Sequence, residues 1–366
     1  MSPDASCKLN GYRQCMPACR KSPFLCSAGE RKDHESIRSE KVFHKDMNQS
    51  RQKFIFCLAF AFLCLFLHRA DADTVTTIHV GVPTNSATWF PLYVAWKKGI
   101  FREQGLDLLP VTMQARTALA ALAAKQIGFI TQIGSPMTAI TRGLPASLIM
   151  VLCERSHHVL VTKAEITSPV QLRGRVVAIS QPGGTVHREL LAILEKYKID
   201  PNSVKTVSLG STPNGITALK SGTVDAAMLL IPHDLYLEKD GFKGLVYLKD
   251  ILDFPLAGIV AHNDQLRDHP SEVRKILIGA LSGIEYTKTR GEEVLPLLKD
   301  FLGLESLESA KKTYQRLRDI WSDTGIPSEK GLRTAATLAE VPTTFPVAKL
   351  ANWSFMNEAA AISQSR

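Results

Sequence analysis

Short apolar segments alternate with helix-like segments between residues 76 and 261, which indicates an α/β protein. Residues 76–82 alternate and end at Pro83, as a strand before a turn does, and residues 146–152 are apolar throughout. Residues 117–125 are rich in Ala and Leu and predict a helix. The other predicted strands are 106–111, 127–130, 158–162, 175–180, 205–209, 226–230 and 244–248, and the other predicted helices are 91–98, 136–142, 185–197, 217–221 and 232–239.

The pattern changes after the apolar segment 256–261. Three helices are predicted from there on, at residues 270–289, 292–302 and 306–320. Strands that alternate with helices at these distances imply parallel pairing and right-handed crossovers. Two α/β units followed by a helical tail predict two lobes rather than one continuous sheet.

An export signal is predicted before this region. Residues 54–67 are apolar, follow Arg51 and Lys53, and precede Ala70-Asp71-Ala72. A basic flank, a short apolar run and an A-x-A site are typical of a secretory signal peptide, here residues 47–72, with cleavage after Ala72. A buried hydrophobic helix is the alternative. Because a signal peptide should be N-terminal, we expect translation to start at Met47, and residues 1–46 to be a gene-start error or a disordered extension. The mature chain would then be periplasmic.

Charge and cysteine content exclude several classes of protein. The net charge is +9, but the first 72 residues hold 12 of the 44 basic and 7 of the 35 acidic residues, so the rest of the chain is only mildly basic. No basic run with interleaved aromatic residues follows, so no nucleic-acid partner is expected. Six of the seven cysteines precede residue 73, which leaves Cys153 alone and excludes a disulfide scaffold or a cysteine-based zinc site there.

The motifs of common enzyme classes are absent from the sequence. There is no G-x-S-x-G, H-E-x-x-H, P-loop or G-x-G-x-x-G. His187 and Glu189 are two residues apart, and so lie on different faces of a predicted helix and cannot form an acid/base pair there. We therefore predict a protein that is not an enzyme and needs no cofactor or metal.

Several segments resemble a known family. They are VGVPTNSATWFPLYVAWKKGIFREQGLDL, GSPMTAITRGLPASLIMVL, ISQPGGTVHRELLAIL, VDAAMLLIPHDL and the terminal VPTTFPVAKLANWSFMNEA. Their order and spacing are similar to those of the nitrate/sulfonate/taurine-type periplasmic solute-binding proteins of ABC transporters, which a thiamine-pyrimidine synthase also resembles.

The resemblance implies a type II periplasmic-binding-protein fold, in which two crossover segments join two α/β lobes. The crossovers are expected near residues 153–158 and 254–258. Lobe 1 would combine residues 73–155 and 256–366, and lobe 2 would be residues 156–255. The resemblance also implies a monomer that holds a small solute between its lobes and presents it to an inner-membrane ABC permease.

Loops of small and hydroxylated residues precede several predicted helices. Helix N-termini carry unsatisfied N–H groups and a partial positive charge, so several of them around one crevice would bind an anion. Capping of the helices is the alternative for any one loop, but open α/β sheets bind ligands at this edge. The candidate ligand-binding residues of these loops are Asn85, Ser86, Ala87, Thr88, Gly134, Ser135, Gly183, Gly184, Thr185, Ser211 and Thr212.

Four further side chains are candidates. Arg155 is expected at the first crossover, where its guanidinium could hold a carboxylate or sulfonate; pairing with Glu154 or a surface carboxylate is the alternative. Trp89 could stack on a ligand or pack in the core. His233 could donate a hydrogen bond from lobe 2. Of His157 and His158, which should point to opposite faces of a strand, one is expected to be structural.

Two other functions remain open from the sequence. The same fold hosts enzymes of the menaquinone pathway and of thiamine-pyrimidine synthesis, although the cysteine-rich motif of the latter has no counterpart here. A ligand-sensing receptor without a transporter is the other alternative. The choice among sulfonate, nitrate, carboxylate and pyrimidine is not encoded in any of these motifs.

Overall fold

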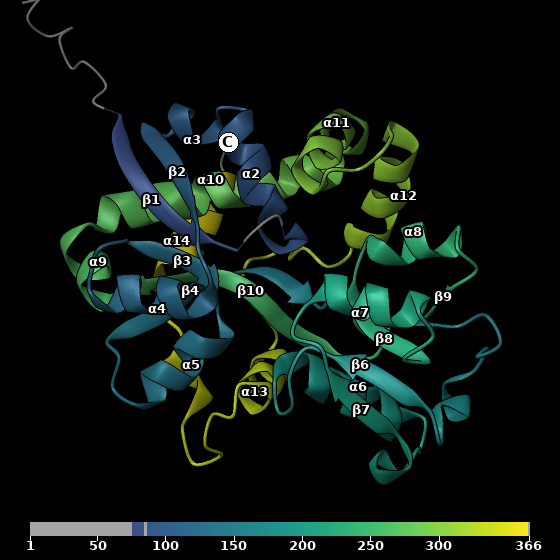
Figure 1. Cartoon of the computed structure of the whole chain (residues 1–366). Helices are drawn as coiled ribbons and strands as arrows, with labels where there is room; N and C mark the ends of the chain where they lie inside the picture. The colour runs from purple at the N-terminus through teal and green to yellow at the C-terminus, as the bar shows by residue number, and fades with distance from the viewer. Residues whose placement is uncertain (1–74, 84–85, 365–366) are drawn as a thin grey trace, which may run out of the picture. The chain divides into compact units, whose positions relative to one another are not determined.

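The computed structural model describes residues 75–83 and 86–364, which contain two five-stranded sheets (Figure 1). The predicted extension 1–46, the predicted signal peptide 47–72 and the candidate residue Asn85 lie outside the described residues. Within the described ranges, no helix combines the length and apolar character that crossing a bilayer requires.

The first sheet has the strand order β2-β1-β3-β10-β4. β1 pairs in parallel with β2 and β3, whereas β10 runs antiparallel to both β3 and β4. Its strands are β1 (Thr76–Val82), β2 (Leu106–Thr112), β3 (Phe129–Gln132), β4 (Ala146–Arg155) and β10 (Asp253–His262).

The second sheet has the strand order β7-β6-β8-β5-β9. β6 pairs in parallel with β7 and β8, whereas β5 runs antiparallel to β8 and β9. Its strands are β5 (His158–Thr162), β6 (Val176–Ile179), β7 (Lys205–Ser208), β8 (Ala226–Leu230) and β9 (Lys243–Tyr247).

The expectation of parallel pairing throughout is wrong for β5 and β10. Only residues 156–157 separate β4 from β5, so no helix carries the chain back to the opposite end of a sheet. The chain leaves the first sheet at the carboxyl end of β4 and enters the second at the edge where β6 and β8 end. A strand that enters at that end must run antiparallel to β8. In the same way, β10 enters the first sheet at the end where β3 and β4 finish, and it runs antiparallel to both.

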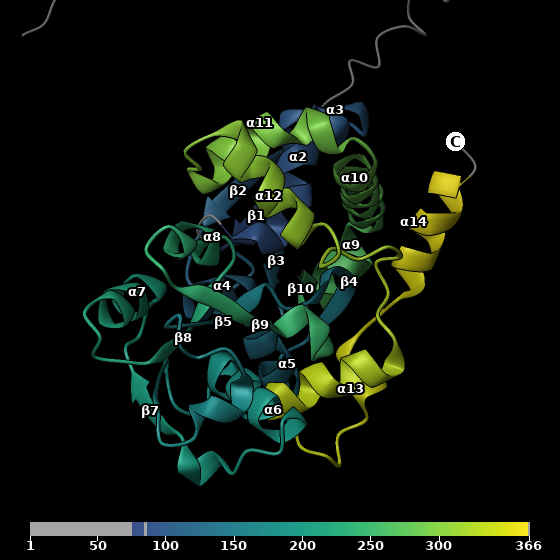
Figure 2. The ribbon, with the colours of Figure 1, turned by 90° about the vertical axis from the view of Figure 1, so that its right-hand side faces the viewer.

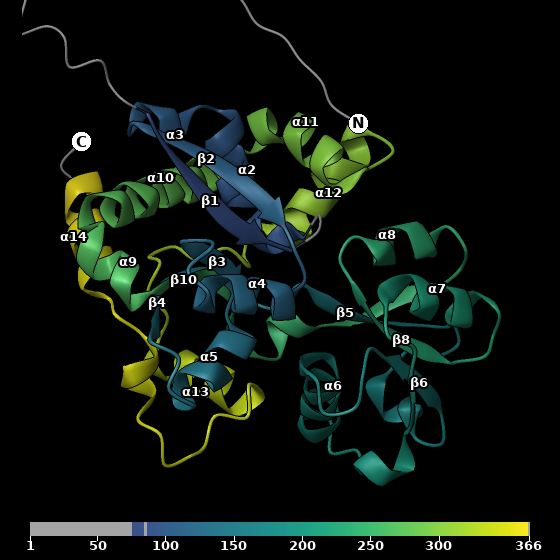
Figure 3. The ribbon, with the colours of Figure 1, turned by 60° about the vertical axis from the view of Figure 1, so that its left-hand side comes forward.

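Helices cover both faces of each sheet (Figures 1 and 3). The helices and the turn η1 are η1 (Ala87–Trp89), α2 (Phe90–Lys97), α3 (Ile100–Glu103), α4 (Ala115–Ala123), α5 (Gly134–Thr141), α6 (Thr185–Lys196), α7 (Thr212–Lys220), α8 (His233–Glu238), α9 (Asn263–Asp268), α10 (Pro270–Thr289), α11 (Gly291–Leu302), α12 (Leu307–Leu317), α13 (Glu329–Leu338) and α14 (Ser354–Gln364). Of these, α3, α9, α13 and α14 were not predicted from the sequence.

The apolar stripes of the helices decide which face each one covers. One face of the first sheet packs against α2 and α10, and the other against α4, α5 and α13. In the second sheet, α6 covers one face, and α7 and α8 cover the other. The C-terminal helix α14 packs along α10 (Figure 2).

The two connections between the sheets, one after β4 and one before β10, lie side by side at the ends of these strands. Arg155 at the end of β4 is the register partner of Asp253 at the start of β10, so the outgoing and returning chains are neighbours. Gly258 permits this close approach, because a Cβ there would collide with the carbonyl oxygen of Met150. The lobe boundaries predicted at residues 155 and 255 fall near these connections and stay a prediction.

Candidate functional site

The strand directions place the predicted loops at two facing ends of the sheets. β1 and β3 end at the edge of the first sheet from which β4 leaves, because β3 and β4 both run against β10. β6, β7 and β8 end at the edge of the second sheet where β5 begins. The loops after these strands therefore lie on either side of the connections between the sheets, where open α/β sheets bind ligands.

The loop after β1 is held by a hydrogen bond within it and by two from buried side chains elsewhere in the chain. The Ser86 hydroxyl oxygen accepts a bond from the Thr88 N–H at 3.4 Å and caps η1. Ala87 and Thr88 are buried, and their carbonyl oxygens accept bonds from the Trp321 indole N–H at 2.9 Å and the Cys153 thiol at 3.2 Å. In this loop Ser86 is the candidate that remains partly exposed, so Ala87 and Thr88 contribute shape rather than accessible side chains.

Trp89 packs in the core, which was one of its two predicted roles. Its side chain is 5% exposed, and its ring lies 4.9 Å from that of Phe301 and 5.9 Å from that of Tyr93. The indole N–H donates to the Pro83 carbonyl oxygen at 3.0 Å. The other role, stacking on a ligand, does not fit a ring that is buried in this aromatic cluster.

The loop after β3 is open. Gly134 and Ser135 are exposed and begin α5, and no atom lies within 4 Å of a Cβ placed on Gly134. These two residues are thus the accessible helix N-terminus on the side of the first sheet.

The second sheet carries a cavity of about 170 Å³ at the ends of its strands. Its polar lining comes from His158, Ser180 and the N-terminus of α7, where Ser211 caps the helix by accepting the Asn214 N–H at 3.5 Å. Thr212, beside Ser211, also lines the cavity. The remaining lining residues are apolar or glycine: Ala178, Ile179, Val186, Gly210, Gly215, Met228 and Leu230. The predicted residues Ser211 and Thr212 therefore line a cavity.

The loop after β6 lines this cavity through Ser180, and α6, which follows the loop, lines it through Val186. Gly183 adopts a φ of +71°, which favours glycine, and its N–H donates to His187 Nδ1 at 3.0 Å. Gly184 is the N-cap of α6, and Thr185 is its exposed first residue. The role of Gly183, Gly184 and Thr185 in ligand binding stays a prediction.

His158 and Glu189 form a buried pair at the cavity. His158 Nδ1 lies 2.9 Å from one carboxylate oxygen of Glu189 and 3.2 Å from the other, and 2.9 Å from the Ser156 hydroxyl oxygen. The Glu189 side chain is 0% exposed and that of His158 is 13% exposed. A wholly buried carboxyl group needs a hydrogen-bond partner, and the His158 imidazole is that partner.

This pair was not predicted from the sequence. Glu189 was considered only with His187, and that pair is indeed absent, because His187 bonds to Gly183. The signal was present nonetheless, since Glu189 falls on the apolar stripe of α6 with Val186, Leu190 and Ile193. A charged residue in such a stripe requires a buried partner, and this criterion would have selected it.

His157 is a structural residue, as one of the two histidines was expected to be. It is 5% exposed, and neither of its ring nitrogens has a hydrogen-bond partner. Burial holds the pKa of His157 well below its usual range, and the neighbouring His158 lowers it further, so the ring is neutral. The expectation that the two histidines point to opposite faces of a strand is wrong: their ring centroids lie 5.1 Å apart, because His157 precedes β5 and does not follow its alternation.

Arg155 and His233 are the two remaining side chains predicted to bind the ligand. The Arg155 guanidinium lies 3.5 Å from the carboxylate of Asp253, and both side chains are exposed; this is the surface-carboxylate alternative. His233 begins α8 and contacts Tyr236, with ring centroids 6.3 Å apart. Burial lowers the pKa of His233, an effect that Asp234 partly opposes. A neutral His233 can still donate a hydrogen bond.

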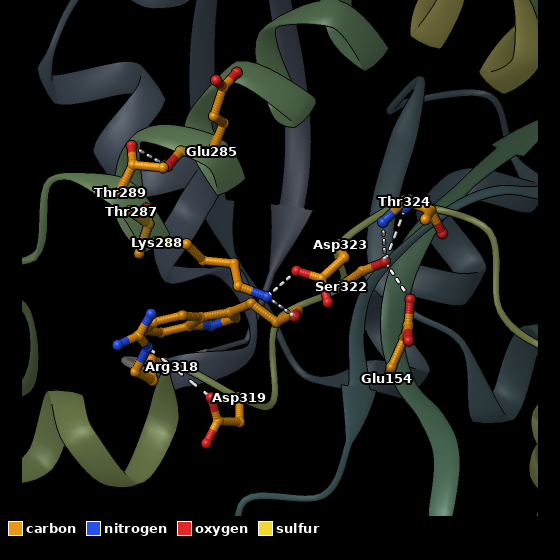
Figure 4. A network of polar contacts seen from close by, with 12 residues as sticks. Glu154, Glu285, Thr287, Lys288, Thr289, Arg318, Asp319, Ser322, Asp323 and Thr324 are labelled. Carbon is orange, nitrogen blue, oxygen red and sulfur yellow. Dashed lines mark hydrogen bonds and ion pairs between the residues drawn. The ribbon is translucent and has the colours of Figure 1, made fainter.

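A larger cavity of about 490 Å³ lies between α10, α14 and the loop that follows α12. Its two cations already face carboxylates (Figure 4): Lys288 pairs with Asp323 and donates to the Trp321 carbonyl oxygen at 3.2 Å, and Arg318 lies 3.9 Å from Asp319. Ser322 bonds in turn to Glu154, which ties the loop to β4. Because these charges are compensated, this cavity is a weaker candidate for an anionic solute. Among the residues that the structure describes, no group of three or more His, Cys, Asp or Glu side chains is arranged to hold a metal ion.

The amino-acid sequence matches the family described as NMT1/THI5 like over residues 86–294. It is also 26% identical over 202 residues to the "Putative binding protein YtlA" of Bacillus subtilis (strain 168), an alignment that covers 52% of this chain and 59% of YtlA. The chain thus spans about three fifths of the length of this curated relative.

Solved structures establish the fold. The periplasmic aliphatic sulphonate binding protein SsuA of Escherichia coli superposes with a TM-score of 0.64 at 18% identity, over 75% of this chain and 97% of SsuA. The desulfurization enzyme DszB superposes with a TM-score of 0.60 at 16% identity, over 80% of this chain and 100% of DszB. The predicted fold class, an α/β periplasmic-binding-protein fold, is confirmed.

Proposed function

The chain belongs to the NMT1/THI5-like family, and we propose that it acts there as an exported solute-binding protein that captures a small anionic organic solute between two lobes. The observation that carries this proposal is the facing arrangement of strand ends, with the Gly134–Ser135 loop on the first sheet and the cavity at Ser211 and Thr212 on the second. Helix N-termini on both sides of the connections supply donors to one anion.

Closure around the solute follows from this arrangement. A solute that contacts donors of both sheets binds the closed form more tightly than the open form, and this difference in affinity shifts the population. Micromolar affinity corresponds to about −8 kcal/mol, which several helix-terminal hydrogen bonds and the apolar wall of Ile179, Val186 and Met228 could supply. The partner that receives the solute is then an ABC permease, and the apolar segment 54–67 supports export to the periplasm.

A thermal-shift screen of the purified protein tests this function. Ethanesulfonate, taurine, nitrate, benzoate and a pyrimidine are the probes, and we expect at least one anion to raise the melting temperature, because a ligand of the native state stabilises it. Titration calorimetry then gives the dissociation constant. If no anion in the panel binds, the proposal is wrong.

An enzyme is the second candidate, because DszB shares the fold. The thiol of Cys153 does not support it: burial raises the pKa of Cys153 well above its usual range, and Glu154 adds to the effect. Incubating the bound anion with the protein and analysing the solution by mass spectrometry separates the two functions. Unchanged solute supports a binding protein, whereas a product that forms with turnover contradicts it.

A further inference from the structure

His158 is the one ionisable residue among the described residues that line the cavity of the second sheet. The other polar groups there are the hydroxyls of Ser180, Ser211 and Thr212, and the walls are apolar. Hydroxyls and amides can orient an anion, but His158 is the group in this cavity that can oppose its charge.

Glu189 fixes the orientation of this imidazole. Nδ1 lies 2.9 Å from the Glu189 carboxylate and 2.9 Å from the Ser156 hydroxyl oxygen, so protein groups engage this ring nitrogen. Nε2 remains for a ligand. Because Nδ1–H donates to the Glu189 carboxylate, a second donor at Nε2 requires the imidazolium.

We propose that His158, as the imidazolium, binds the acidic group of the solute through Nε2–H, and that Glu189 is the positioning residue that keeps the ring oriented. This inference rests on the proposed function and names its ligand class: a sulfonate or carboxylate on a short apolar body. The size of the cavity, about 170 Å³, and the side chains of Ile179, Val186 and Met228 suit such a body.

The charges around His158 favour this role. From α6 it faces Glu189, and from the connecting segment it faces His157, which is neutral because of its burial and does not compete for the anion. β8 and α7 present apolar and hydroxyl groups. Arg155, the cation expected in this place, is engaged with Asp253.

Binding should therefore take up protons. Free histidines change charge between about pH 5 and 8, whereas sulfonates stay anionic throughout. If the anion selects the imidazolium, its affinity falls as the pH rises, by up to about tenfold per pH unit, since at most one proton is linked to each anion bound.

Titration calorimetry on the purified protein tests this with ethanesulfonate and propionate as acidic probes and uracil as a neutral one, at about pH 6 and about pH 8. We expect the acidic probes to bind more tightly at the lower pH, with proton uptake visible as a dependence of the heat on the buffer. His158→Gln should weaken their binding by more than about tenfold and abolish the pH dependence. Glu189→Gln, which keeps the shape of the side chain and removes its charge, should weaken binding less than His158→Gln does and should shift the pH at which the affinity falls.

His269→Gln is the matched control, because His269 is an exposed histidine on the far side of β10 from the second sheet and should leave both affinity and pH dependence unchanged. Equal affinity and pH dependence in wild type and His158→Gln would overturn the inference while the proposed function stands. Tight binding of uracil alone would overturn it too, and binding of no probe would remove both. Should the variants not fold, ¹⁵N-histidine NMR of the wild type decides: ethanesulfonate must shift the Nε2 signal of His158, and an unmoved signal contradicts the inference.

Discussion

Arg316 on α12 forms an ion pair with Asp234 on α8, and so ties a helix beside the first sheet to a helix of the second. The Asp234 side chain is 0% exposed, and the Tyr247 hydroxyl donates to the same oxygen at 2.8 Å. Arg316 also donates to Glu238 at 2.9 Å. The two sheets are thus joined by an ion pair with a buried carboxylate as well as by the chain itself.

Replacing Arg316 by Met should destabilise the protein by about 3–5 kcal/mol, because it leaves the buried carboxylate of Asp234 without a cation. Urea unfolding at neutral pH measures the loss. Lys239→Met is the matched control: it breaks the pair with Glu305, at 2.7 Å, which joins the same two regions at the surface. The control should unfold close to wild type, and equal losses in both variants would contradict the role given to burial.

The loss in Arg316→Met should depend on pH. Burial raises the pKa of Asp234 even in the wild type, against the opposing effects of Arg316 and Tyr247. A folded-state pKa above the unfolded one means that folding favours the protonated acid, so stability falls as the pH rises through that interval. Removing Arg316 widens the interval, and the variant should recover part of its stability when the pH is lowered from 7 towards 5. A loss that is constant with pH would contradict this explanation.

Asp225 should stabilise the second sheet only above acid pH. Burial alone raises the pKa of Asp225, but the hydrogen bonds from Lys163 at 2.9 Å and the Val176 N–H at 3.0 Å, together with Arg175, outweigh it and hold the pKa below its usual value. A lowered folded-state pKa gives stability that is present above the unfolded pKa and lost as the pH falls through the folded one.

Asp225→Asn should therefore cost about 1–3 kcal/mol at neutral pH, and the difference from wild type should shrink below about pH 4. Thermal unfolding across this range measures it. Asp240→Asn, which removes an exposed partner of Lys220, serves as the control and should show little change at any pH.

Cys153 should be inert in the folded protein. Its thiol is buried and donates to the Thr88 carbonyl oxygen at 3.2 Å, and its pKa is raised, so little thiolate forms. Iodoacetamide labelling followed by peptide mapping should leave Cys153 unmodified in native protein and label it fully in urea. Rapid labelling of the native protein would favour the enzyme alternative.

Arg155→Ala tests whether Arg155, the residue predicted from the sequence, or His158, the residue proposed from the structure, contributes more to anion binding. Arg155 is paired with Asp253 at the surface, so we expect Arg155→Ala to weaken ethanesulfonate binding less than His158→Gln does. Asp253→Asn, which frees Arg155, controls for the pair. A larger loss in Arg155→Ala than in His158→Gln would return Arg155 to the site.

Local pattern predicts the elements well and their long-range partners poorly. The bounds of β1 and β5 agree with the prediction, because alternation that ends at Pro83 marks β1 and a short apolar run marks β5. The reversed direction of β5 and β10 could not be read locally, since it depends on which edge of a distant sheet the chain enters. Ser211 and Thr212 were found because capping chemistry is local. The place of Glu189 in an apolar stripe was also a local signal, but its partner His158 lies on another element and could not be identified from the sequence.

The adjacency of Arg155 and Asp253 has a mechanical consequence. Because β4 and β10 are paired neighbours up to Arg155 and Asp253, the two connections to the second sheet leave the first sheet side by side. Adjacent connections permit one sheet to rotate relative to the other without breaking strand pairs in either, so the solute capture that we propose needs no unfolding of either sheet.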